Sequence, residues 1–114
     1  MRRVEAACTA RAAGLRRVPA VRTRRAFLTS FPARRLVEQD FVRTVDAIVP
    51  PRAHKPGFKR LTAAAERRVD AADALNEAVL TRDVGAARAA LSKSRSSSVV
   101  IEREAHTFGA SCTA

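Results

Sequence analysis

The cysteines and histidines, which are common nucleophiles, bases and metal ligands, are Cys8, His54, His106 and Cys112. A thiolate with a histidine as its base can attack a carbonyl carbon, and Cys112 with His106 could form such a pair. Both lie in a tail with no other catalytic signal, so we do not predict catalysis there. Because Cys8 and Cys112 stand near opposite ends of the chain, we predict no disulfide between them. Neither histidine has ligand spacing to a cysteine, which predicts no metal site.

Sequence motifs for cofactor binding and catalysis are missing. Glycine occurs only at positions 14, 57, 85 and 109, so no glycine-rich loop can hold a dinucleotide or a nucleotide phosphate. The chain also lacks H-E-x-x-H, C-x-x-C and G-x-S-x-G. Its five scattered Phe make no stacking platform for single-stranded nucleic acid. We therefore predict a protein that is not an enzyme, with no cofactor and no small-molecule substrate.

Positive charge is concentrated in the first third of the chain. The whole sequence carries a net charge of +11. Residues 1–37 hold ten arginines against one acid and so carry +9, whereas residues 38–114 hold twelve Lys and Arg against ten acids and carry +2. A net charge of +11 predicts attraction to nucleic acid or to an anionic surface. Most of that attraction would be lost if residues 1–37 were cleaved from the protein.

Residues 1–34 form a basic leader, rich in arginine and alanine and almost free of acid. Drawn as a helix, the leader has a moderately apolar side, on which Arg11 intrudes. Segments of this kind are drawn to anionic membrane surfaces and are recognised by import receptors. The alternative is a disordered basic arm kept in the mature protein, as in many ribosomal proteins.

One short motif favours import. Arg25, Phe27 and Ser30 form an R-x-F-x-x-S pattern, which resembles the signature of mitochondrial presequences that are cut twice. The resemblance implies a first cut after Ala26 and a final N-terminus at Arg35. It also implies a mitochondrial location, with a plastid as the second choice.

The remainder of the chain predicts an all-α fold, a small helical hairpin or three-helix body with flexible N- and C-terminal extensions. Apolar residues at spacings of three and four predict helices over about 36–49 and 59–81 within a body of residues 35–93. Pro50-Pro51 ends the first helix, and Pro56-Gly57 predicts a turn in a linker where His54 is exposed. Asp83 is suited to cap a third helix over 84–92, joined to the second at residues 81–83.

The apolar stripes of the first two helices are predicted docking faces. Their members are Phe41, Val45, Ile48, Leu61, Val69, Leu75 and Val79. The far side of the second helix carries Glu66, Asp70, Asp73 and Glu77, most simply a solvated acidic face. Residues 94–114 are predicted to be an extended or flexible tail, because serines surround Arg95 and the β-branched residues 99–101 favour a short strand.

These patterns predict a non-enzymatic accessory subunit of a mitochondrial multiprotein complex, with the respiratory chain or ATP synthase favoured. The thin, alanine-rich core and the one-sided helices favour packing against other protein subunits. No apolar run approaches the roughly 18 residues of a membrane span. The alternative function is an RNA-binding protein of an organellar ribosome, in which the basic leader contacts rRNA phosphates.

Overall fold

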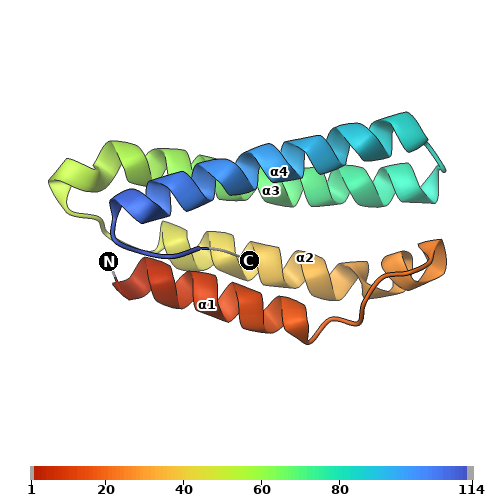
Figure 1. The fold of residues 1–114 in the computed structure, drawn as a ribbon, viewed down its shortest axis with the longest axis horizontal. Coiled ribbons are helices and arrows are strands. Elements are labelled where there is room, and N and C mark those ends of the chain that lie inside the picture. Colours follow the sequence, from red (N-terminus) through yellow and green to blue (C-terminus); the bar gives the residue numbers. More distant parts are fainter. Residues whose placement is uncertain (1, 113–114) are drawn as a thin grey trace.

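Residues 2–112, the part of the chain that the structure describes, form an antiparallel four-helix bundle (Figure 1). In this computed structural model the helices are α1 (Arg2–Arg16), α2 (Arg24–Asp46), α3 (Lys55–Leu80) and α4 (Val84–Thr107), with a short 3-10 helix, η1 (Arg52–His54), before α3. The hairpin of α1 and α2 forms one layer and the hairpin of α3 and α4 forms the other. The predicted all-α class is confirmed.

Helix α2 is much longer than the sequence pattern predicted. It begins at Arg24 and not at residue 36, because the Thr23 side chain caps it by accepting a hydrogen bond of 3.1 Å from the Ala26 N–H. Arginine favours the helix, so the basic composition of the first turns is no obstacle. Pro32 lies inside the helix, where it leaves only one backbone carbonyl without its usual donor. The last part of the leader is thus regular helix.

The α3–α4 hairpin matches the prediction most closely. Helix α3 covers almost the predicted range, but the predicted turn at Pro56-Gly57 is the first turn of α3. Proline is well tolerated there because the first helical N–H groups have no partner within the helix. The predicted joint at residues 81–83 is confirmed, since Asp83 caps α4 by accepting a hydrogen bond of 3.0 Å from the Ala86 N–H.

Helix α4 continues to Thr107, so the predictions of a helix ending at residue 92, a flexible joint and a short strand are wrong. Two of the serine hydroxyls are satisfied within the helix, since Ser96 and Ser97 donate hydrogen bonds to carbonyls four residues back, Ser97 at 2.8 Å. Ile101 is almost fully buried. Its burial outweighs the small helix penalty of a β-branched residue.

Helix α1, which lies entirely within the basic leader, is part of the hydrophobic core. Val4 is completely buried, and Ala7 and Cys8 are nearly so. They pack into one cluster with residues of α2, α3, α4 and the segments beyond α2 and α4. Its other buried members are Phe41, Val45, Ile48, Phe58, Leu61, Ala64, Ala65, Ile101, Ala105, Phe108 and Ala110. The expected flexible N-terminal extension is therefore a packed helix.

Cys8 and Cys112 form a disulfide, so the prediction that they do not pair is wrong. Their Cα atoms lie 5.1 Å apart although the residues are 104 positions apart in sequence. An even number of antiparallel helices brings the segment after α4 back to the end of the bundle where α1 begins (Figure 1). Buried Phe108 and Ala110 hold that segment against the bundle.

Candidate binding groove

The groove exists because α1 is too short to complete the bundle. It has 15 residues, whereas α2, α3 and α4 have 23, 26 and 24. At about 1.5 Å per residue, α1 is roughly 22 Å long and the others roughly 34–39 Å. Beyond Arg16, the end of the bundle that holds the α3–α4 turn consists of α2, α3, α4 and the connection of residues 17–23, from which Val21 lines the groove (Figure 1). A groove of about 760 Å³ occupies the vacant position.

Three helices present regular stripes to this groove. The α2 stripe is Arg24, Phe27, Phe31, Arg34 and Glu38. The α3 stripe is Arg68, Ala71, Ala72, Leu75, Ala78, Val79 and Arg82, which lies just past the helix end. The α4 stripe is Val84, Ala87, Ala90, Leu91 and Ser94. Successive members are mostly three and four positions apart, the spacing with which helices of a bundle contact one another.

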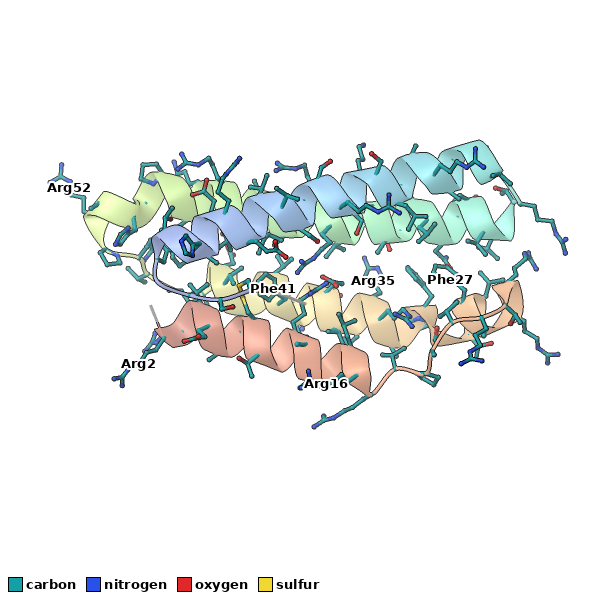
Figure 2. The ribbon with its side chains drawn as sticks, in the orientation of Figure 1. Arg2, Arg16, Phe27, Arg35, Phe41 and Arg52 are labelled. Atoms are coloured by element: carbon teal, nitrogen blue, oxygen red, sulfur yellow. A yellow bond between two sulfur atoms is a disulfide. The ribbon has the colours of Figure 1, made fainter. Side chains whose placement is uncertain are left out.

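The walls of the groove are predominantly apolar. Phe27 projects from α2 toward the α3–α4 layer (Figure 2) and lies next to Phe31, with ring centroids 6.0 Å apart. On α4, Val84 and Leu91 keep 64% and 40% of their surface exposed. Small alanines line much of α3, which leaves room for another helix to approach closely. Contiguous exposed apolar side chains of this kind mark binding surfaces.

A buried charge cluster forms the inner end of the groove. Glu38 accepts hydrogen bonds from Arg68 Nε at 2.7 Å and from Arg11 Nε at 2.9 Å. All three side chains are nearly buried, and the Arg68 guanidinium also lies 5.1 Å from the centroid of the Phe41 ring. Two guanidiniums bind one carboxylate, so these three groups together carry one excess positive charge, and the negative charge of Glu102 also acts on Arg68.

Arg68 is the most constrained member of the cluster. Its Nη2 is buried and has no hydrogen-bond partner among the described residues. Burial lowers the pKa of Arg68 to about 10, and the attraction of Glu38 opposes that shift. The guanidinium is therefore charged at neutral pH and depends on Glu38 for compensation.

The rim of the groove carries further arginines. Arg24 crosses from α2 to the end of α3, where it donates hydrogen bonds to the carbonyls of Val79 and Leu80 at 3.0 and 3.1 Å. Carbonyls at the end of α3 lack the usual donor four residues ahead, although the Val79 carbonyl also accepts the Arg82 N–H at 3.3 Å. Arg34 donates a hydrogen bond to the Pro19 carbonyl at 3.0 Å. Within residues 2–112, neither arginine pairs with a carboxylate.

The structure separates the predicted docking residues into two groups. Phe41, Val45, Ile48 and Leu61 are buried in the core, so their partners belong to this chain. Leu75 and Val79 line the groove. Val69 is half-buried on α3 outside the groove.

The residues of the proposed processing motif lie in the first two turns of α2. Arg25 is exposed, Phe27 lines the groove and Ser30 is buried.

The predicted chemical residues assemble no catalytic pair or metal site. Cys112 is in the disulfide, so it offers no thiol to His106. His54 is half-buried in η1, not exposed, because its ring contacts Phe108 edge-on at 5.1 Å. The described residues contain no group of three His, Cys, Asp or Glu that could hold a metal ion. No helix within residues 2–112 is long and apolar enough to cross a membrane, as predicted.

Comparisons with protein-family models, with curated proteins and with solved structures find no match for this chain. The function is therefore inferred from the groove.

The charged inner end of the groove was not predicted from the sequence, although two features of the sequence indicated it. Arg11 intrudes on the apolar side of the leader helix, and Arg68 lies three positions after Ala65 in the apolar stripe of α3. An arginine on a core-facing stripe indicates a buried acidic partner.

Proposed function

We propose that the protein is a non-enzymatic accessory subunit of a mitochondrial multiprotein complex, and that its groove holds a helix of a neighbouring subunit. The observation that carries the proposal is the vacant helix position beyond α1. A bundle gains stability when the apolar stripes of each helix are covered, and here the stripes of three helices face an open space. A respiratory-chain or ATP-synthase complex is the setting that we favour.

The exposed groove residues give a direct test. Replacing Leu91 with arginine places a long charged side chain in the groove, and we expect it to weaken association with the native complex by at least about tenfold. Replacing Val99 with arginine is the matched control, since Val99 lies on the same helix, is 58% exposed and does not line the groove. The measurement is the fraction of each tagged protein that co-sediments with the complex in extracts of the native source.

Circular dichroism should show that both variants keep their helix content. If Leu91→Arg co-sediments as well as Val99→Arg, the groove is not the docking surface. If the unaltered protein sediments as a monomer in native extracts, the accessory-subunit proposal fails as a whole.

We also propose that the leader directs the protein to mitochondria and then stays in the mature chain. Cleavage at Arg35 would remove α1, with its buried Val4 and Cys8, and would leave Glu38 without Arg11. We expect mass spectrometry of the protein from its native source to find the residues of α1 still attached to the mature chain. An N-terminus at Phe27 or Arg35 would contradict retention and would favour the double-cut presequence.

A further inference from the structure

We propose that the groove selects an acidic amphipathic helix, which carries carboxylates at both ends of a short apolar stripe. This inference rests on the proposed function and names the chemistry of the partner. Five arginines line the groove, namely Arg11, Arg24, Arg34, Arg68 and Arg82. The acids that line it are Glu38 and Asp83, so the groove has a net charge of +3.

The two acids are already engaged within the chain. Glu38 accepts hydrogen bonds from Arg11 and Arg68. The Asp83 carboxylate accepts the Ala86 N–H that begins α4. Neither acid neutralises the rim arginines of α2. The apolar walls therefore lie beneath a rim with uncompensated positive charge, and the complementary surface is apolar in its centre and negative at its edges.

The rim arginines would bind a carboxylate more strongly than they bind their present acceptors. Arg24 and Arg34 donate to backbone carbonyls of Val79, Leu80 and Pro19, which carry no net charge. A guanidinium binds a carboxylate more strongly than a neutral carbonyl, and the planar fork fits both carboxylate oxygens. A guanidinium carries five N–H groups, so Arg24 can bind an incoming carboxylate while it keeps its two hydrogen bonds to the end of α3.

The spacing of the arginines sets the spacing of the carboxylates. Arg24 and Arg34 belong to one stripe of α2 and are ten positions apart, or about 15 Å along the helix axis. Phe27 and Phe31 lie between them on the same stripe. A partner helix that runs alongside α2 would match this pattern with two acids about ten or eleven residues apart and apolar residues at spacings of three and four between them.

The geometry favours a helix over an apolar small molecule. The three stripes continue the bundle, and the vacant position has the length by which α1 falls short of α4, roughly 14 Å or two to three turns. The surface of this chain does not supply the occupant. Its acidic stripe on α3 belongs to a helix whose apolar side is already buried in the core, with Leu61, Ala65 and Ala71 among the buried residues. The expected occupant is therefore a different protein.

Two synthetic peptides test the inference on the full-length, disulfide-bonded protein. Each has about 16 residues with a leucine stripe at spacings of three and four; one carries glutamates about ten positions apart and the other carries glutamines there. Fluorescence anisotropy of labelled peptides gives the dissociation constants. We expect the glutamate peptide to bind about three- to thirtyfold more tightly, as two partly exposed ion pairs would allow. The preference should shrink when NaCl rises from about 0.05 to about 0.5 M.

Protein variants assign the preference to the rim. The double variant Arg24→Gln, Arg34→Gln is expected to bind both peptides equally, whereas Arg25→Gln keeps the preference because Arg25 is exposed outside the groove. Equal binding of both peptides by the unaltered protein, abolished by Leu91→Arg, would overturn the acidic preference and leave the proposed docking function standing.

Three other outcomes would overturn the inference and the docking function together. Neither peptide binds in the first case. In the second, the protein forms a concentration-dependent dimer in analytical ultracentrifugation that Leu91→Arg disrupts, so that a second copy fills the groove. In the third, oleate binds saturably and neither peptide displaces it.

Discussion

Replacing Glu38 with glutamine is expected to lower the free energy of unfolding by about 3–5 kcal/mol. Glu38 is 8% exposed and is the carboxylate that compensates both Arg11 and Arg68. Glutamine keeps the volume of the side chain but removes its charge. Two nearly buried guanidiniums would then lie together without the carboxylate that binds both. Arg68, whose pKa is about 10 with Glu38 in place, would lose the attraction that opposes its burial and would keep only the smaller attraction of Glu102.

Urea unfolding followed by circular dichroism at pH 7 measures this effect. The matched control is Asp73→Asn, which breaks the ion pair of Asp73 with Arg35 at 2.7 Å. Both of those side chains are more than one-third exposed and screened by solvent, so the control should cost much less than Glu38→Gln. If Glu38→Gln costs as little as the control, the charge cluster does not hold the two layers together.

Breaking the disulfide is expected to lower the free energy of unfolding by about 2–5 kcal/mol. The bridge joins residues 104 positions apart, so in the unfolded chain it closes a very long loop and removes much of the conformational freedom. The change is Cys112→Ser, because Cys112 is only partly buried and serine fits its place. Urea unfolding of the oxidised protein and of this variant gives the difference.

A reductant provides the control for this prediction. Dithiothreitol should shift the unfolding midpoint of the unaltered protein to that of Cys112→Ser and should leave the variant unchanged. An unaltered protein whose midpoint does not move on complete reduction would show that the bridge adds no stability. The bridge contributes only where the surroundings are oxidising, because cellular thiols keep such cysteines reduced elsewhere.

The fold could be predicted where one local signal decides the structure. The long apolar stripe of α3 and the capping residue Asp83 specify the α3–α4 hairpin without help from distant residues. The first half of α2 and the second half of α4 were missed because their composition suggested other states. The arginines after Thr23 suggested a basic leader and not the start of α2. The serines and β-branched residues up to Ile101 suggested a flexible joint and a strand and not the second half of α4. Burial against other helices decided both cases.

The candidate site could be predicted only in part, because a helix stripe does not reveal what covers it. Leu75 and Val79 were correctly placed on an apolar face, and that face lines the groove. Phe41 and Leu61 gave the same pattern but are covered by this chain. The groove arises because α1 is shorter than its neighbours. The apolar stripe of a single helix does not reveal how long the helices beside it are. The pairing of Cys8 with Cys112 likewise depends on the number and direction of the helices between them.

The bridge between residues 8 and 112 also has a mechanical consequence. It closes residues 8–112 into a covalent ring. A pulling force applied at Cys8 and Cys112 would pass through the sulfur–sulfur bond, and the helical residues between them would bear none of the load. In an assembly that applies force to its subunits, the disulfide would prevent residues 8–112 from being extended between these two positions. In the reduced protein, the same force could unfold the helices one after another.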